Sequence, residues 1–306
     1  MATGNEAPEP HAAVLTWRVG TTRVTQVEER VVAIPHGAIL SDDMPEYVEA
    51  ERPWIDPFVT IDGRLLLSLH SFVIESCGLT IVVDTCVGRH GERPLPGDDA
   101  FPDRLAAAID GGLAAVDVVL CTHLHFDHVG WNTIRDPSSG RLVPTFPSAR
   151  YLVTNDELAT YADHDHYAVG PVSVDPLADA GLLDGVEVDH RITPEVVLLP
   201  TPGHTVGHVS VLIESSGESA LITGDAVHSP LQFAHPHLTA ERFDTDSTGA
   251  INTRRLLVDR LVGTSTIVLG THFAPPVAGR IVSRHGSIEF DAADLTDKPD
   301  LPDKPA

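Results

Sequence analysis

Positively charged side chains are scarce in this chain of 306 residues. Lys and Arg together number 20 against 44 Asp and Glu, so the formal net charge at pH 7 is −24. Nucleic acids and anionic membrane surfaces bind proteins through basic patches, and this charge balance therefore excludes both as expected partners. No apolar run approaches the ~18 residues that a membrane-spanning helix needs. The first twelve residues lack the basic and apolar regions of a secretory signal, so we expect none.

Cysteine is also rare, with only Cys77, Cys86 and Cys121 in the whole chain. Their odd number and scattered spacing fit neither a disulfide framework nor a cysteine metal site, which favours a reducing, cytoplasmic location. Hydrophobic residues make up 42% of the chain, enough for a sizeable core, so global disorder is excluded. Histidine, in contrast, occurs 17 times. Because imidazole binds metals and carries protons, the positions of these histidines matter.

The composition predicts one domain over residues 14–290, with a flexible arm at 1–13 and a flexible tail at 291–306, where prolines and aspartates leave little to bury. Between these ends, short β-branched runs are broken by Gly, Pro and Asp, which is typical of strands. The predicted strands are Val14–Val19, Arg23–Ile34, Leu65–Glu75, Leu79–Asp84, Val116–Cys121, Arg150–Val153, Val196–Leu199, His208–Glu214, Ser219–Thr223 and Thr266–Gly270. The predicted helices are Met44–Ala50, Pro102–Ile109, Asn155–Asp163, Val174–Ala180 and Gly249–Leu261.

One internal similarity refines this reading. The segment Ser71–Gly78 parallels Ser210–Gly217, and each is followed by an apolar strand that ends in an aspartate, Asp84 or Asp225. Two copies of such a hairpin indicate two related β-lobes that share one core. We therefore predict a single α/β domain made of two packed β-sheets flanked by helices.

The strongest chemical signal is the run CTHLHFDHVG at Cys121–Gly130, which follows a predicted buried strand. Three histidines and one aspartate lie within six residues, and four such polar groups removed from water need a partner, which a divalent cation supplies. The first two histidines alternate and can point to one side, while the aspartate and last histidine can reach a neighbouring point. This geometry suits two metal ions a few ångströms apart. The four residues are His123, His125, Asp127 and His128.

Three more candidate ligands follow other predicted strands. His204 lies in a Pro-Gly turn, Asp225 follows Gly224 at a strand end, and His272 comes just after a strand. Strand ends are where α/β proteins collect ligands. Histidine nitrogen and carboxylate oxygen are ligands that zinc commonly takes, and a carboxylate can bridge two ions.

The order His-x-His-x-Asp-His, Gly-His, Gly-Asp and a strand-end His resembles the metallo-β-lactamase superfamily, over about residues 65–285. The resemblance implies a metallo-β-lactamase-like αββα sandwich that holds two divalent cations, with zinc as the default. It implies that His123, His125 and His204 hold the first cation and that Asp225 bridges the two. The second cation would be held by Asp127, His128 and His272.

Within the superfamily, the presence of His128 and of Asp225 rather than Cys is similar to the methyl parathion hydrolase and acyl-homoserine lactonase branch. This implies a hydrolase that cleaves an ester, lactone or phosphotriester with a metal-bridging hydroxide. Acyl-homoserine lactonases typically carry Tyr at the position of His228, so the resemblance departs from them there. The alternatives are iron-dependent sulfur or oxygen chemistry at a single iron, and a non-catalytic metal-binding protein.

Two residues are candidates for a direct catalytic role. Asp127 could orient the nucleophile and then protonate the leaving oxygen, and His228 could contact the substrate or leaving group, or be structural. Around the site, Asp84 is expected to bond a ligand histidine or the first motif, and His208 to orient the turn that carries His204.

Loops around the metals should select the substrate. The segment His36–Pro57, with aromatic neighbours, is a plausible wall or lid, and its alternatives are a seal for the sandwich and a homodimer contact. The candidate side chains in or next to this segment are Met44, Tyr47, Trp54 and Phe58. The other aromatic candidates are Trp131, Phe233, Phe243 and Phe273. His164 and His166, with Tyr161 and Tyr167, form either part of a pocket wall or a solvated helix end. The aromatic candidates in these loops favour a small, uncharged or weakly polar ester or lactone as the substrate.

Overall fold

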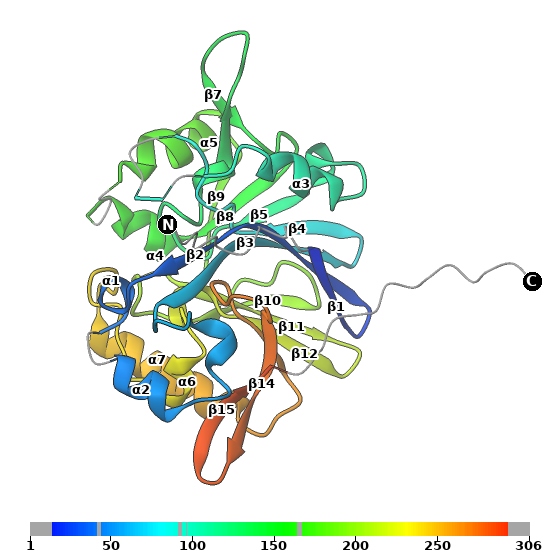
Figure 1. Ribbon diagram of the computed structural model, residues 1–306. Helices are drawn as coiled ribbons and strands as arrows, with labels where there is room; N and C mark the ends of the chain where they lie inside the picture. Colours follow the sequence, from blue (N-terminus) through cyan, green and yellow to red (C-terminus); the bar gives the residue numbers. More distant parts are fainter. Residues whose placement is uncertain (1–13, 42–43, 91–93, 96, 164–166, 293–306) are drawn as a thin grey trace, which may run out of the picture.

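The computed structural model describes residues 14–41, 44–90, 94–95, 97–163 and 167–292 (Figure 1). The predicted arm at 1–13 and residues 293–306 of the predicted tail lie outside these ranges. Within them, two β-sheets lie face to face, with helices on both outer sides. This is the predicted αββα sandwich. No helix of the described ranges is long and apolar enough to cross a membrane.

The first sheet has seven strands in the order β1-β2-β3-β4-β5-β8-β9. Their bounds are Val14–Val19, Thr22–Ile34, Leu65–Ser76, Leu79–Val83, Val118–Leu120, Arg150–Thr154 and Leu183–Val186. The second sheet has six strands in the order β10-β11-β12-β13-β14-β15. These span Val196–Pro200, Val209–Ser215, Glu218–Ile222, Ile267–Leu269, Ala278–Arg284 and Ser287–Asp291. A separate hairpin joins β6 (Thr133–Arg135) to β7 (Leu142–Pro144).

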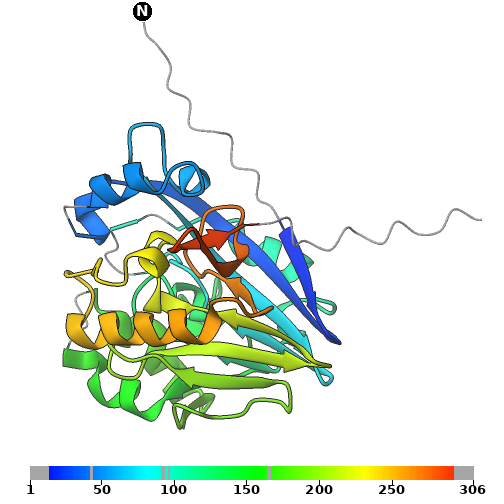
Figure 2. The same cartoon turned by 90° about the horizontal axis from the view of Figure 1, so that it is seen from below.

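The helices divide between the two outer faces (Figures 1 and 2). Near the first sheet lie α3 (Phe101–Ala107), α4 (Asn155–Thr160) and α5 (Asp175–Asp179). Near the second lie α2 (Met44–Ala50), α6 (Leu231–Ala234) and α7 (Ser247–Leu261), while α1 (His36–Ile39) follows the end of β2. Leu105 and Leu177 pack in the cluster of the first face, and Leu257 packs in that of the second.

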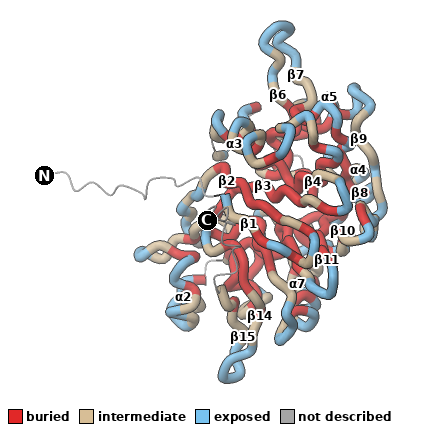
Figure 3. The backbone as a smooth tube through the Cα atoms, turned by 90° about the vertical axis from the view of Figure 1, so that its right-hand side faces the viewer, coloured by how far each residue is buried: buried red, intermediate tan, exposed pale blue. Residues whose placement is uncertain are grey.

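Three hydrophobic layers hold the sandwich together. The middle layer joins both sheets, with Phe72 and Ile81 from the first meeting Val211 and Ile222 from the second. Most of the central strands are therefore buried on both faces, which explains why the sequence shows continuous β-branched runs rather than alternation (Figure 3). The tips of the β6–β7 and β14–β15 hairpins are exposed (Figure 3).

The two similar sequence segments form equivalent hairpins, as predicted. In β3–β4 the turn is Cys77–Gly78, and in β11–β12 it is Ser216–Gly217, and all four residues have positive φ angles between 50° and 83°. That is the conformation of a two-residue type I′ turn, which matches the twist of paired strands. In both lobes the second strand of the hairpin then pairs in parallel with the next strand, β4 with β5 and β12 with β13. Within each parallel pair, the carboxyl ends of the two strands therefore lie at the same edge of the sheet, and the candidate site residues follow these ends.

Several elements were not predicted, namely β6, β7, β9, β14, β15, α1 and α6. These elements are short, or they carry charged residues that obscure the hydrophobic periodicity by which strands and helices are recognised. In β14–β15, Arg284 pairs with Glu289 and Asp291 on the exposed side, while Ile281 and Phe290 are buried. The strand β15 includes Asp291, so the sheet extends one residue into the predicted tail.

Glu195 links the edges of the two sheets through four hydroxyl groups. Its carboxylate accepts hydrogen bonds from Ser215 in the second sheet at 2.6 Å and from Ser76 and Thr22 in the first at 2.8 Å, with Thr21 as the fourth donor. These bonds lower the pKa of Glu195 to about 2. A carboxyl whose pKa is lowered by folding stabilises the native state above its unfolded pKa and loses that contribution as the pH falls through the folded pKa.

We therefore predict that Glu195→Gln unfolds at a lower temperature than the parent at pH 7, and that this gap narrows as the pH falls from about 4.5 to about 2. Thermal unfolding of both proteins, followed by circular dichroism across that range, measures the gap. An unchanged gap at pH 3 would contradict the assignment.

Candidate metal centre

The histidine-rich motif occupies the loop between β5 and the short helical turn Gly130–Asn132. Asp84, just after β4, holds both ends of this loop. Its carboxylate accepts the backbone N–H of Thr122 at 2.8 Å, the Thr122 hydroxyl at 2.8 Å and the Nδ1–H of His128 at 2.9 Å. Asp84 was expected to bond either a histidine or the motif loop, and it bonds both.

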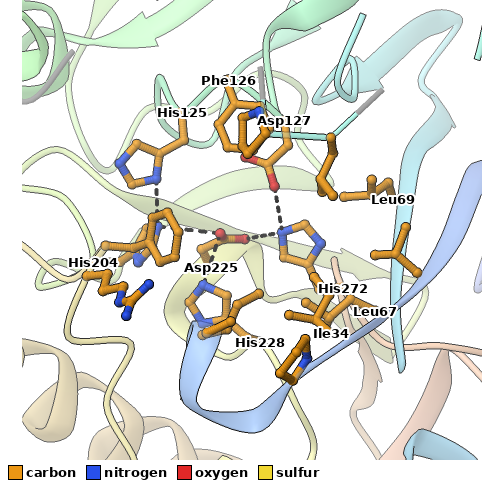
Figure 4. Close-up of a pocket in the computed structure, with 18 of the residues that line it drawn as sticks. Ile34, Leu67, Leu69, His125, Phe126, Asp127, His204, Asp225, His228 and His272 are labelled. Carbon is orange, nitrogen blue, oxygen red and sulfur yellow. Dashed lines mark hydrogen bonds and ion pairs between the residues drawn. The ribbon is translucent and has the colours of Figure 1, made fainter. Parts of the chain in front are cut away.

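The structure brings all seven candidate ligands together in two groups. Five of them, His125, Asp127, His204, Asp225 and His272, are labelled in Figure 4. Within each group the potential ligand atoms all lie within 4.8 Å of one another. The first group contains His123, His125, His204 and Asp225, and the second contains Asp127, His128 and His272.

The Asp225 carboxylate touches both groups. Its Oδ2 atom lies 3.4 Å from Nε2 of His204 in the first group and 3.3 Å from Nε2 of His128 in the second. Its Oδ1 atom lies 3.1 Å from Nε2 of His272. A buried carboxylate in this position can share its two oxygens between two adjacent cations.

The hydrogen bonds behind the histidines orient their free nitrogens toward the centre. Nδ1 of four rings has an acceptor for its proton, which turns the Nε2 atom of each ring toward the group. The pairs are His123 with the Thr122 hydroxyl at 3.1 Å, His128 with Asp84 at 2.9 Å, His204 with Asp244 at 3.0 Å and His272 with the Ser68 carbonyl at 3.1 Å. Thr122 can accept because its own proton goes to Asp84.

Whether metal ions fit this site can be judged from the atoms that converge on it. Nε2 of His123 is buried without a hydrogen-bond partner within the described part of the chain, and Oδ1 of Asp225, also buried, has no hydrogen bond there beyond its ion-pair contact with His272. Two such atoms among imidazole nitrogens and carboxylate oxygens suit divalent cations of the zinc type, which bind that mixture of donors. The residues therefore fit two metal ions.

The pKa shifts of the candidate ligand histidines show how burial and the neighbouring carboxylates act on them. Burial lowers the pKa of His123 and of His125 well below the ordinary value, which keeps both rings neutral. Burial acts the same way on His128 and His272, but the neighbouring carboxylates, Asp225 foremost, outweigh it and raise both pKa values. The centre thus favours positive charge, and cations compete with protons for it.

Besides Asp84, a second carboxylate supports the site, that of Glu157 in the first turn of α4. It was not identified from the sequence. Although the glutamate is buried, its carboxylate accepts the Leu124 N–H at 2.9 Å, the Thr205 hydroxyl at 2.7 Å and the Gly207 N–H at 3.2 Å. It therefore ties the motif loop to the turn that carries His204. Burial raises the pKa of Glu157, although these bonds oppose that rise.

The pair Asp244 and Arg254 was also missed. Asp244 accepts Nδ1–H of His204 at 3.0 Å, and the fully buried Arg254 of α7 lies 3.7 Å from the other carboxylate oxygen. Burial opposes ionisation of Asp244, but His204, His228 and Arg254 together lower its pKa to about 2. The signal available in the sequence was an arginine placed in line with the apolar face of the predicted helix.

We predict that Asp244→Asn weakens binding of the first cation by about ten- to hundredfold, because it removes the charge that orients and polarises His204. Competition with a chromogenic chelator measures the affinity. Asp259→Asn, the same change at an exposed position of α7, serves as the control and should leave the affinity unchanged. Equal affinities for the two variants would contradict the role of Asp244.

His208 and His228 both contact Asp225. Nδ1–H of His208 bonds the Thr201 carbonyl at 3.0 Å, and its Nε2 accepts the backbone N–H of Asp225 at 2.8 Å. His208 is thus bonded to the turn before His204, as expected, and also fixes Asp225. His228 places Nε2 3.2 Å from Asp225 Oδ2, stacks on His272 with an interplanar angle of 7°, and lines the cavity above the site.

That cavity has a volume of about 500 Å³, and members of both ligand groups form its floor, namely His125, His204 and Asp225 from the first and Asp127 and His272 from the second. One wall is aliphatic and comes from the end of β2, from α1 and from the start of β3; it comprises Val32, Ile34, Ala38, Ile39, Leu67 and Leu69. Ile34, Leu67 and Leu69 stand on the His272 side of the floor (Figure 4). On the other side lie His125 and His204 (Figure 4). Phe243, whose ring lies beside that of His125, and Arg242 also line the cavity.

The predicted walls are only partly correct. From the segment 36–58, Ala38 and Ile39 line the cavity. Phe58 is a core residue and Trp54 packs against the same cluster, as the sealing alternative anticipated, and Met44 is buried there too. Phe243 and Tyr167 do line it. Trp131, Phe233 and Phe273 do not, because their large apolar surfaces are buried in the outer layers instead. His164 and His166 lie outside the described residues.

Residues 66–272 match the sequence model of the Metallo-beta-lactamase superfamily, and the chain belongs to that family. Among curated relatives, it is 30% identical to an N-acyl homoserine lactonase of Bacillus sp. over 116 residues, which cover 38% of this chain and 40% of the lactonase. It is 27% identical to a probable metallo-hydrolase of Mycobacterium bovis, over 54% of this chain and 58% of that protein. The chain thus spans well under two thirds of the length of these relatives.

Solved structures show the same fold. The hydrolase AbOPH, of the beta lactamase superfamily, superimposes with a TM-score of 0.76 at 22% identity, over 92% of this chain and 98% of that chain. AidC, a dizinc quorum-quenching lactonase in complex with its product N-hexnoyl-L-homoserine, has a TM-score of 0.70 at 16% identity, over 90% and 96%.

Proposed function

We propose that this protein is a hydrolase that uses two divalent cations, zinc by default, to cleave an ester or lactone bond, with phosphotriesters as the related class. The observation that supports the proposal is the position of Asp225, whose carboxylate contacts histidines of both candidate ligand groups on the floor of a largely apolar cavity. The names of the relatives, a lactonase and metallo-hydrolases, support the same class.

Two cations held by these residues would ionise a shared water at neutral pH and polarise the substrate's carbonyl or phosphoryl oxygen. Asp225 would set their separation, and Asp84, Asp244 and the Ser68 carbonyl would keep the ligand rings oriented. Because these contacts exist before substrate binds, the site needs little reorganisation during the reaction.

Asp127 and His228 are the proposed catalytic side chains. Asp127 belongs to the second group, lines the cavity and has a partly exposed carboxylate, with oxygens 3.8 Å from His128 Nε2 and 3.7 Å from His272 Nε2. It is placed to orient the nucleophile and to pass a proton to the leaving oxygen. His228 faces the cavity beside Asp225 and would contact the substrate or leaving group there.

A panel of aryl esters, lactones and phosphotriesters, assayed with and without a chelator, tests the proposal. We expect turnover of at least one ester class, its loss with the chelator and its return with zinc, together with about two equivalents of metal per chain. One equivalent of iron with oxidation of a sulfur or oxygen substrate would favour the iron alternative instead. Fully loaded protein that leaves the whole panel intact would favour a non-catalytic metal-binding protein.

A further inference from the structure

The cavity continues into a smaller recess on the His125 side, which we call the side hollow. It has a volume of about 280 Å³ and shares His125, Phe126, Tyr167, Arg242 and Phe243 with the main cavity. The aliphatic wall lies on the opposite, His272 side of the floor (Figure 4). A substrate whose reacting carbonyl sits over the floor therefore extends one arm to each side.

The two sides differ in chemistry. The aliphatic wall offers no hydrogen-bonding side chain, and it suits an alkyl chain. In the side hollow, the rings of Phe126 and Tyr167 pack at 4.9 Å, and the ring of Phe243 lies 6.3 Å from that of His125. Arg242 adds a guanidinium group to these aromatic surfaces.

Arg242 has no carboxylate partner within the described part of the chain, although acidic residues outnumber basic ones more than twofold. Other arginines, such as Arg104 and Arg150, each pair with an aspartate. Asp244 also lines the side hollow, and its carboxylate is engaged by His204, by the Ala240 N–H and by Arg254. The guanidinium at the side hollow is therefore available to a ligand.

The geometry points to a substrate with two unlike arms, an aliphatic chain on the His272 side and a carboxylate-bearing, preferably aromatic, arm against Arg242. This inference rests on the proposed function, and it replaces the expectation of an uncharged substrate. A guanidinium binds a carboxylate through two parallel hydrogen bonds, and aromatic walls accept a planar group. Because Arg242 is exposed, we expect a moderate preference rather than an absolute requirement.

Two hexanoate esters test this inference, one of 4-hydroxybenzoate and one of 4-hydroxybenzamide. Hydrolysis adds the oxygen of one water to the acyl carbon, breaks its bond to the phenol oxygen, and releases hexanoate, the phenol and a proton. The leaving groups have the same shape, but only the benzoate is charged. We expect kcat/KM to favour the benzoate ester by about five- to tenfold. We expect this ratio to fall to near one in Arg242→Gln and to invert in Arg242→Glu.

Arg255→Gln, the same change at an exposed position of α7, is the matched control and should keep the parent ratio. Metal content is measured for every variant. A ratio near one in the parent, or an unchanged ratio in Arg242→Gln, would overturn the inference while leaving the proposed function intact. If neither ester is cleaved, calorimetric titration with 4-hydroxybenzoate decides. Binding that is lost in Arg242→Gln supports the anion site, and absence of binding to the parent overturns it.

Discussion

Asp225→Asn is expected to lower turnover roughly a thousandfold and to reduce bound metal from about two equivalents to about one or fewer. The substitution keeps the shape of the side chain but removes the negative charge that five neighbouring histidines face. It also replaces one carboxylate oxygen with an NH₂ group that donates hydrogen bonds and cannot bind a cation. Since the Asp225 carboxylate lies within 3.4 Å of histidines from both ligand groups, both of the proposed cations would lose a ligand at once.

Elemental analysis after dialysis measures the metal, and circular dichroism verifies that the sheets and helices persist. Asp259→Asn is the control, because it makes the same chemical change on the exposed side of α7. The double variant His123→Ala with Asp225→Ala should lose most of the metal while the secondary structure remains. Full metal content in either Asp225 variant would show that the ligand assignment is wrong.

Glu157→Ala is expected to have the largest effect on stability, lowering the free energy of unfolding by about 3–5 kcal/mol. The truncation leaves the N–H groups of Leu124 and Gly207 buried without their acceptor, and it frees the turn that carries His204 from the motif loop. Each unpaired buried donor costs about 1–3 kcal/mol, and hydrogen bonds to a charged acceptor are stronger than average. The variant should also bind the first cation less tightly, because the two loops that supply its ligands are no longer linked.

Chemical denaturation of the metal-free proteins measures this energy separately from metal binding. Glu46→Ala, at an exposed position of α2, is the matched control and should change the free energy of unfolding by no more than about 0.5 kcal/mol. Glu157→Gln should fall between the parent and the alanine variant, since the amide keeps one accepting oxygen. A loss below about 1 kcal/mol in Glu157→Ala would contradict the proposed role of this carboxylate in joining the two loops.

The fold and the candidate ligands could be predicted from the sequence because their signals are local. The central strands are buried on both faces and therefore appear as unbroken β-branched runs, and each candidate ligand follows such a run or lies within one dense motif. The duplicated hairpin, with Asp84 and Asp225 after its two copies, further indicated that two lobes meet.

The supporting carboxylates Glu157 and Asp244 were not predicted, because their partners are distant in the chain and neither residue ends a predicted strand, as Asp84 does. Glu157 bonds Leu124 and Thr205, which are 33 and 48 residues away, and Asp244 bonds His204 from 40 residues away. An acidic residue early in a helix is common for local reasons, so nothing in the sequence distinguished Glu157. The cavity walls were uncertain for another reason. Aromatic side chains such as Trp131 and Phe233 gain more by burial in the core than by lining a pocket, and the walls are largely aliphatic instead.

Anomalous diffraction at the zinc edge from crystals of the zinc-loaded protein tests the central claim most directly. We expect two peaks on either side of Asp225, one bound by His123, His125 and His204 and the other by Asp127, His128 and His272. Each should lie about 2.0–2.2 Å from its ligand atoms. A single peak, or peaks that Asp225 does not contact, would contradict the account.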